Sequence, residues 1–330
     1  MKSRIFILSG ILAAQLLLAG VLNLTGEEYG AFQAEDKLLS FDKQAVSGLR
    51  IEDGTDSVVL EKQEGQWLLP ESGDFPASQR DVGNLLDNLA ALQKGWPVAR
   101  TRGAARRFSV DEDQFERKLT LVSDDDSQAI LFVGSSPGFR KVYVRPADGN
   151  EIFAVAFNTW EADAKADGWI DKDILKLDES EVERIEMPGL ILQRQDGELQ
   201  VADLSESEQT SGEERRSLLA RLTGLRIQSL LGTDAKPEYR QDEPTLEFTI
   251  MRRGGEVLSY RFSKPEDGAY YVLKRSDMEV YFKVAEYTID PVRDTTREKL
   301  VQDKTEETSS EAAENNPDAK VDNASAAQEQ

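Results

Sequence analysis

The sequence predicts an α+β fold: an N-terminal transmembrane helix, two repeated antiparallel-sheet modules each with one covering helix, and a disordered acidic tail. Three observations lead to this prediction. An apolar run occupies residues 5–24, a pattern of hairpins and helix occurs twice at an offset of about 130 residues, and residues 301–330 contain few large apolar side chains. The predicted segments are therefore a signal anchor, a stalk, the two modules and the tail, at residues 1–24, 25–37, 38–177, 178–300 and 301–330.

The N-terminal segment reads "MKSRIFILSGILAAQLLLAGVLNL". As a helix, residues 5–24 would span about 30 Å, which matches the hydrocarbon core of a bilayer. A cleaved signal peptide is the alternative, but no clear small-x-small cleavage site follows the run. Lipid attachment at "LLLAGV" is excluded because Val21 stands where the lipidated Cys would be. Lys2 and Arg4 favour a cytoplasmic N-terminus. We therefore expect a single-pass protein of the bacterial inner membrane whose bulk lies in the periplasm.

The two modules begin with similar strands and turns. "VVLEKQEGQW" at residues 58–67 and "LILQRQDGEL" at residues 190–199 each predict a strand, a tight turn and a return strand. Gly65 and Gly197 supply the positive φ that such a turn needs. An alternating strand precedes each hairpin, "VSGLRIED" in the first module and "VERIEMPG" in the second. The shared order indicates an internal duplication.

Each module continues with an amphipathic helix. Residues 78–93 carry an apolar stripe at helical spacing, formed by Val82, Leu85, Leu86, Leu89 and Leu92. Residues 211–232 repeat this pattern with Leu218, Leu219, Leu222 and Leu225. Ser78 with Asp81, and Ser211 with Glu214, are placed to cap the two N-termini.

Hairpins follow each helix. Residues 117–134 correspond to residues 244–263, and residues 140–160 correspond to residues 269–289. A helix with a single apolar stripe needs a sheet to cover that stripe, so each module is predicted as one sheet with one helix on its face. Whether the modules pack about a pseudo-twofold axis or lie in tandem stays open. The acidic composition from residue 301 onward is typical of a disordered tail.

The composition excludes several classes of function. A net charge of −22 and a pI near 4.5 argue against nucleic-acid binding and against broad adhesion to anionic lipid. The chain has no His and no Cys, which excludes Ser-His-Asp triads, thiol nucleophiles, His metal ligands and zinc ribbons. Cation sites built from carboxylates and carbonyls, hydrolysis by a carboxylate pair, and Ser-Lys chemistry stay open. We predict no enzyme, no cofactor and no metal site.

The basic stretch "KGWPVARTRGAARR", residues 94–107, differs from the rest of this acidic chain because it contains no acidic residue. It is interpreted as a docking patch for an acidic partner or for lipid head groups. The alternative is a solvated loop that balances acidic neighbours. The candidate docking residues are Lys94, Trp96, Arg100, Arg102, Arg106 and Arg107.

Other local features have simpler interpretations. "GSSPGF" at residues 134–139 and "DDD" at residues 124–126 are read as turns, and the acidic clusters at residues 111–116 and 171–183 as solvated surfaces. The aromatic residues of the last hairpin suit cross-strand packing, with a carbohydrate-stacking face as the alternative. These aromatic residues are Tyr270, Tyr271, Tyr281 and Phe282.

The N-terminal anchor, the strand-turn "EGQWLL", the helix "NLLDNLAAL" and the strands "LFVG", "KVYVR" and "EIFAV" together resemble the bacterial DUF4340 family, a domain of unknown function. The resemblance covers about residues 38–300. Members are membrane-anchored and are often encoded beside ABC transporter permeases and auxiliary proteins, so it implies an accessory extracytoplasmic subunit of an ABC-type system. No catalytic residues carry over.

Three hypotheses follow. The first is a non-catalytic accessory or scaffolding subunit that contacts an ABC permease or an auxiliary membrane protein. The second is an envelope module that binds glycan, lipid or peptide in a concave groove. The third is a hydrolase whose chemistry depends on two carboxylates facing each other across a cleft.

Overall fold

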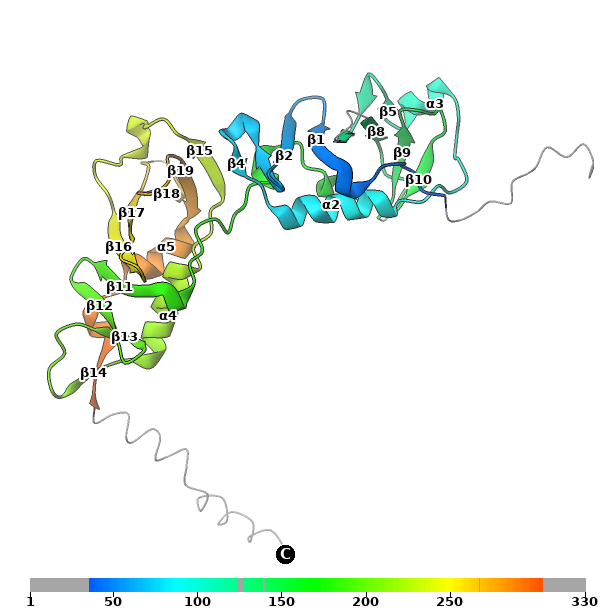
Figure 1. Ribbon diagram of the computed structural model, residues 1–330. Coiled ribbons are helices and arrows are strands. Elements are labelled where there is room, and N and C mark those ends of the chain that lie inside the picture. Colours follow the sequence, from blue (N-terminus) through cyan, green and yellow to red (C-terminus); the bar gives the residue numbers. More distant parts are fainter. Residues whose placement is uncertain (1–35, 124–127, 139, 267, 305–330) are drawn as a thin grey trace, which may run out of the picture. The chain divides into compact units, whose positions relative to one another are not determined.

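The computed structural model describes residues 36–304, except 124–127, 139 and 267 (Figure 1). The chain divides into two compact units, Met1–Trp169 (unit 1) and Ile170–Gln330 (unit 2). Each unit contains one eight-stranded antiparallel sheet with helices, so the predicted α+β class is confirmed. The predicted anchor at residues 1–24 lies outside the described residues. Within the described residues, no helix is long and apolar enough to cross a membrane.

Unit 1 has the sheet order β10-β9-β8-β7-β1-β2-β3-β4. Its strands are β1 (Val46–Glu52), β2 (Ser57–Gln63), β3 (Gln66–Leu69), β4 (Phe75–Pro76), β7 (Arg117–Ser123), β8 (Gln128–Val133), β9 (Val142–Pro146) and β10 (Phe153–Val155). A separate small hairpin joins β5 (Val110–Asp111) and β6 (Gln114–Phe115). The helical elements are α2 (Gln79–Ala91), α3 (Arg102–Arg107), η1 (Lys43–Ala45), η2 (Pro70–Ser72), η3 (Thr159–Glu161) and η4 (Ala166–Gly168).

Unit 2 has the sheet order β13-β12-β11-β16-β17-β18-β19-β15. Its sheet strands are β11 (Val182–Met187), β12 (Leu190–Gln195), β13 (Glu198–Val201), β15 (Ser229–Gly232), β16 (Leu246–Arg252), β17 (Val257–Ser263), β18 (Tyr270–Arg275) and β19 (Tyr281–Ala285). β14 (Glu208–Thr210) and β20 (Val301–Asp303) form a separate pair. The helical elements are α4 (Gly212–Thr223), α5 (Glu286–Arg293), α6 (Arg297–Leu300), η5 (Glu179–Glu181) and η6 (Pro237–Tyr239).

The two sheets have the same connectivity over seven strands. β3-β2-β1-β7-β8-β9-β10 in unit 1 matches β13-β12-β11-β16-β17-β18-β19 in unit 2. A short 3-10 turn precedes the first strand of each unit, and an Asp side chain caps it, Asp42 at the start of η1 and Asp178 at the start of η5. Near its start, each first strand also shifts register against the neighbouring strand, β7 or β16.

The predicted hairpin turns are confirmed. β2 pairs with β3 and β12 pairs with β13, and Gly65 and Gly197 have φ values of 84° and 90°. The preceding Glu64 and Asp196 also have positive φ, near 50°. Two successive positive φ values fit the right-handed twist of the flanking strands, which explains why both turns end in glycine.

Helix α2 forms as predicted. The Ser78 hydroxyl accepts from the Asp81 amide at 3.3 Å, and the stripe from Val82 to Leu89 is buried. Figure 1 shows α2 along one face of the unit 1 sheet. The cap and the apolar stripe both lie within the helical segment itself, so the sequence of this segment is enough to predict the helix.

Helix α4 corrects the sequence analysis. Its Ser211 cap is present, but the helix ends at Thr223 rather than continuing to residue 232. Gly224 terminates it, and the chain turns back to form β15 on the far edge of the sheet. Leu225 is buried but lies beyond the helix. The prediction of one helix per sheet is also wrong for unit 2, where α5 packs beside α4 and buries Ile289 and Val292.

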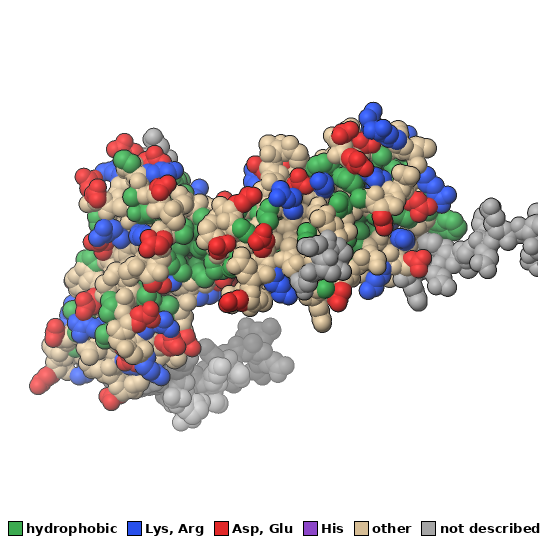
Figure 2. All heavy atoms as spheres, turned by 45° about the horizontal axis from the view of Figure 1, so that its top comes forward, with side chains coloured by type: hydrophobic (Ala, Val, Ile, Leu, Met, Phe, Trp, Pro, Cys, Tyr) green, Lys and Arg blue, Asp and Glu red, His purple; other side chains and the backbone are tan. Residues whose placement is uncertain are grey.

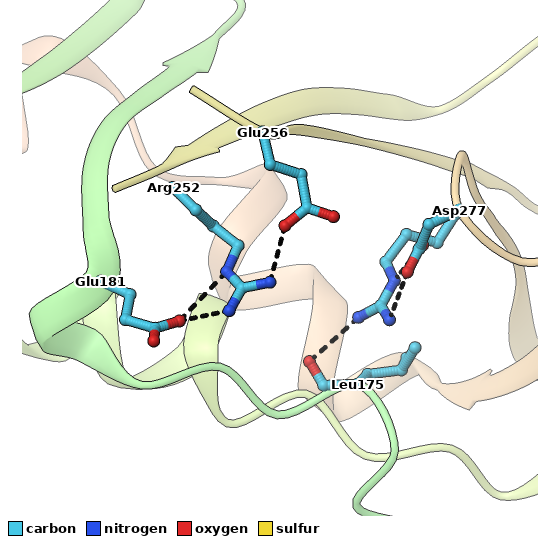
Figure 3. Close-up of polar contacts among 6 residues, drawn as sticks. Leu175, Glu181, Arg252, Glu256 and Asp277 are labelled. Carbon is cyan, nitrogen blue, oxygen red and sulfur yellow. Dashed lines mark hydrogen bonds and ion pairs between the residues drawn. The ribbon is translucent and has the colours of Figure 1, made fainter. Parts of the chain in front are cut away.

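Two arginines of the unit 2 sheet hold the segment that enters it (Figure 3). The buried Arg275 guanidinium pairs with Asp277 at 2.7 Å and donates to the Leu175 carbonyl at 3.3 Å. Arg252 pairs with Glu181 and with Glu256. Residues 170–177, which the sequence analysis assigned to the first module, belong to unit 2.

The predicted tail begins too early. Residues 301–303 form β20, which pairs with β14 from Glu208↔Asp303 to Thr210↔Val301. Short polar strands such as this one carry no apolar alternation, so their pairing cannot be recognised from composition. Residues 305–330 lie outside the described residues.

Candidate functional site

The basic stretch at residues 94–107, called here the basic edge, begins where the described chain enters unit 1. The Lys94 amide donates to the Asp36 carbonyl at 2.7 Å, and Lys37 bridges to Gln93. The chain then runs beside β10, where Val98 and Ala99 exchange backbone hydrogen bonds with Ile152 at 2.7 and 2.8 Å. The basic edge is thus fixed by backbone pairing at two points.

Helix α3 forms the second half of the basic edge. The Thr101 hydroxyl caps it by accepting from the Ala104 amide at 3.2 Å. Ala104 and Ala105 are buried against a small apolar cluster that contains Val110, Phe132 and Ile152. Since these alanines face inward, the basic residues of α3 are left on its outer side, and all of them are exposed.

Gly134 allows α3 to pack close to the end of β8. A Cβ atom at this position would lie 2.0 Å from the Phe108 carbonyl oxygen and 2.5 Å from that of Ser109. The Ser135 amide donates to the same Phe108 oxygen at 2.9 Å. Ser136 then closes the turn through its hydroxyl, which donates to the Lys141 carbonyl at 2.7 Å. The "GSSPGF" stretch therefore serves as a turn and a close backbone contact.

The carboxylate of Asp111 organises the arginines of α3. It is only 5% exposed, and Arg102 and Arg106 form ion pairs with it at 3.8 and 3.9 Å. The side chains of these two arginines remain 75% and 57% exposed. Arg100 pairs with Glu151 at 2.8 Å. Paired on one side only, the guanidinium groups keep most of their surface in solvent.

Aromatic and aliphatic side chains accompany these charges. Trp96 is 72% exposed and Val98 is 47% exposed, which is unusual for large apolar residues. The Arg107 guanidinium lies over the Phe108 ring, 4.7 Å from its centroid, and Phe108 stacks on Tyr143. Figure 2 shows Lys and Arg side chains along the edge of unit 1 that carries α3.

The structure places the six predicted docking residues along this one edge. Arg102 and Arg106 both form ion pairs with Asp111, and Arg100 forms one with Glu151. Lys94 lies beside Asp36, where the described chain begins. Sequence reasoning missed Asp111, which belongs to a cluster interpreted as solvated. The only available signal was its position three residues after Phe108, directly after the basic stretch.

Unit 2 has a different structure at the corresponding position. The segment after α4 forms β15, which pairs with β19 at three positions, and then η6. Tyr239 of η6 is buried and donates its hydroxyl to the Leu231 carbonyl at 2.7 Å. Arg240 pairs with Glu243 at 2.6 Å. Unit 2 therefore has an additional edge strand, β15, where unit 1 has the basic edge.

The outer face of the unit 2 sheet carries a groove of about 550 Å³. Its polar lining comes from alternate positions of β11, β16, β17 and β18, with Tyr281 of β19 at one side. The Tyr281 ring packs against Tyr239 at 5.3 Å and under Lys274 at 4.9 Å. The groove is therefore lined by both polar and apolar side chains, and its aromatic residues are Phe248, Tyr260 and Tyr281.

The other aromatic residues of the last hairpin pack as the cross-strand interpretation predicts. Tyr271 is fully buried, donates its hydroxyl to Asp290 at 2.8 Å and accepts from Arg293 at 2.7 Å. Burial, reinforced by the hydrogen bond to Asp290, raises the pKa of Tyr271 to about 12. Phe282 is also fully buried, and Tyr270 lies under Lys283. Tyr281 alone of the four lines the groove.

A second groove, of about 530 Å³, lies beside α2 in unit 1. Its lining is acidic around Trp160, which is exposed. Glu161 in this groove is already engaged, since it accepts from Asn88 and from Asn158, both at 2.7 Å. Across the described parts of the chain, no group of three or more acidic residues is placed to hold a metal ion.

Comparisons with known proteins add one finding. Residues 67–244 match the model of a family described as a domain of unknown function, DUF4340. The match begins in β3 of unit 1 and ends just before β16 of unit 2, so it covers parts of both units. Comparison with curated proteins and with solved structures found no match.

Proposed function

We propose, from the premise that the chain belongs to the DUF4340 family, that it is a membrane-anchored accessory or scaffolding subunit of an ABC-type transport system. It has no catalytic role in this proposal. The apolar run at residues 5–24 anchors it in the bacterial inner membrane, with the N-terminus in the cytoplasm and both units in the periplasm. Its partner is the permease or an auxiliary membrane protein of the same system.

The scaffolding role rests on one observation: the two units share a sheet framework but differ at one sheet edge. Seven strands share their order in both units, and the capped 3-10 turn and the register shift recur. We infer from this that the units arose by internal duplication. Because only unit 1 has the basic edge, the two copies offer different surfaces to partners, as a scaffold requires.

Purification of the full chain from its native membrane in mild detergent tests the proposal. The expected result is recovery of an ABC permease or of its auxiliary membrane protein, identified by mass spectrometry. A chain without residues 5–24 is the matched control and should recover much less. Intact chain that carries neither partner would refute the proposal.

The groove on unit 2 favours a second candidate, a module that binds envelope glycan. Its aromatic side chains, Tyr281 among them, can stack on a sugar ring, and the polar side chains beside them can bind the hydroxyl groups. Titration of the full chain with peptidoglycan fragments should give binding that Tyr281→Ala abolishes. Tyr287→Ala is the control, because Tyr287 is exposed on α5 and does not line the groove. Equal binding by all three proteins, or by none, would exclude this function.

A further inference from the structure

We propose that the basic edge of unit 1 binds the surface of an anionic bilayer, with Trp96 and Val98 among the lipid head groups and the arginines on the phosphates. The inference rests on the proposed function in one respect, since it takes residues 5–24 as the anchor that brings the chain to the membrane. It goes further by assigning a ligand, the anionic phospholipid head group, to a defined surface.

The described chain enters unit 1 beside the basic edge, which favours a position of this edge near the membrane. Asp36 and Lys37, the first described residues, pair with Lys94 and Gln93 at the start of the basic edge. Residues 25–35 separate them from the predicted anchor, and a chain of that length reaches at most about 40 Å. The basic edge therefore begins at the point of unit 1 to which the membrane tether attaches.

The charge distribution of the chain also favours contact between the basic edge and an anionic bilayer. The whole chain carries −22, so an anionic bilayer repels most of its surface. The basic edge itself contains no acidic residue and has five basic ones, Lys94, Arg100, Arg102, Arg106 and Arg107. Three of them pair with carboxylates of neighbouring segments, Arg100 with Glu151 and both Arg102 and Arg106 with Asp111, which leaves an excess of positive charge. Attraction to a charged surface extends only about one Debye length, near 10 Å. A tethered protein with this charge distribution turns its basic edge to the lipid.

The side chains of the basic edge also suit the lipid head-group region. An exposed Trp beside arginines is typical of the bilayer interface, where the indole lies at head-group level. Arg102 and Arg106 form ion pairs with the buried Asp111 at 3.8 and 3.9 Å, which gathers them on one side of α3, and both remain more than half exposed. Each guanidinium group can therefore still donate two hydrogen bonds to a phosphate.

The test places the full chain in nanodiscs made with or without phosphatidylglycerol. Quenching of Trp96 by brominated lipid is measured as the difference between the wild-type chain and Trp96→Phe, since Trp67, Trp160 and Trp169 also emit. In discs with phosphatidylglycerol we expect strong quenching that added salt reverses. In discs of phosphatidylcholine alone the quenching should be several-fold weaker.

Two double variants make the result specific. Arg102→Gln with Arg106→Gln should abolish most of the quenching, because each basic residue near an anionic surface contributes to binding. Lys236→Gln with Arg240→Gln removes the same charge from the corresponding segment of unit 2 and should change nothing. Quenching that is absent in all discs, or that does not depend on phosphatidylglycerol and on Arg102 and Arg106, would overturn the inference.

A separate measurement distinguishes this failure from failure of the proposed function. If the chain does not stay in nanodiscs, the anchor is wrong, and co-sedimentation of the free chain with phosphatidylglycerol vesicles then tests the basic edge by itself. Binding that the Arg102 and Arg106 substitutions weaken about tenfold supports the inference, and no binding refutes it. If the same substitutions instead remove a co-purifying permease and leave lipid contact unchanged, the edge binds an acidic protein.

Discussion

Gly134→Ala should detach α3 from the sheet of unit 1. The new methyl carbon would lie 2.0 Å from the Phe108 carbonyl oxygen, whereas carbon–oxygen contacts are near 3.3 Å at their closest. The two backbones must therefore separate by more than about 1 Å. That movement strains or breaks the hydrogen bond from the Ser135 amide to Phe108, now 2.9 Å. Overpacking costs about 1–3 kcal/mol and the lost hydrogen bond about 1 kcal/mol, so we expect a loss of about 2–4 kcal/mol.

Native-state hydrogen exchange measures this loss unit by unit, which matters because a chain of two units need not unfold in one step. Amides in residues 104–115 should lose protection, while those of β16 to β18 in unit 2 serve as an internal reference. The control is Gly103→Ala in α3, where an added Cβ meets nothing within 4 Å. It should be neutral or stabilise by up to about 1 kcal/mol. Unchanged protection in Gly134→Ala would refute the close contact.

Three further predictions concern unit 2. Arg275→Met should destabilise the entering segment by about 1–3 kcal/mol because it leaves the carbonyl of the buried Leu175 without this donor, whereas Arg261→Met on the exposed face should cost at most about 0.5 kcal/mol. Hydrogen exchange in residues 170–178 compares the two. The hydrogen bond from Arg297 holds the pKa of Glu208 at about 2, below its ordinary value of 4.5. The stabilisation of β14 and β20 by this ion pair is then complete above pH 4.5 and is lost as the pH falls toward 2. Amide hydrogen exchange in β20 should therefore become faster between pH 4.5 and 2. In Arg297→Gln the same amides should exchange faster already at neutral pH. Burial raises the pKa of Tyr271 to about 12, so stability from this group falls only above pH 10, and an absorbance titration near pH 10 should be the same for wild type and Tyr271→Phe.

Local signals account for what the sequence predicted well. Ser78 and the stripe from Val82 to Leu89 specify α2 within a few residues of chain, and the glycines of the two hairpin turns are required by their own φ values. The α4 helix shows the limit of such signals. Leu225 continues the helical spacing of Leu222, yet it is buried from a loop because Gly224 has already ended the helix.

The basic edge was visible in composition, but its structure was not. Asp111 is surrounded in sequence by Glu112 and Asp113, so it looked solvated, and only the fold buries it under two arginines. Gly134 likewise fits a turn by sequence, while its close contact with Phe108 depends on where α3 packs. Tertiary contacts of this kind, between Gly134 and Phe108 or between Asp111 and the arginines of α3, leave no periodic trace in the chain.

The difference between the units lies at one sheet edge, and this argues that the edge is functional. In unit 2, β15 pairs with β19 at three positions and is the outermost strand of the sheet. In unit 1 the chain makes a single bridge, Ala99↔Ile152, beside the three-residue strand β10 before it turns into α3. A sheet edge with unpaired backbone groups can associate with other chains. Proteins usually cover such an edge or place charged side chains on it. Unit 1 carries arginines and an exposed Trp96 near this edge, and this combination suits a surface that binds a partner.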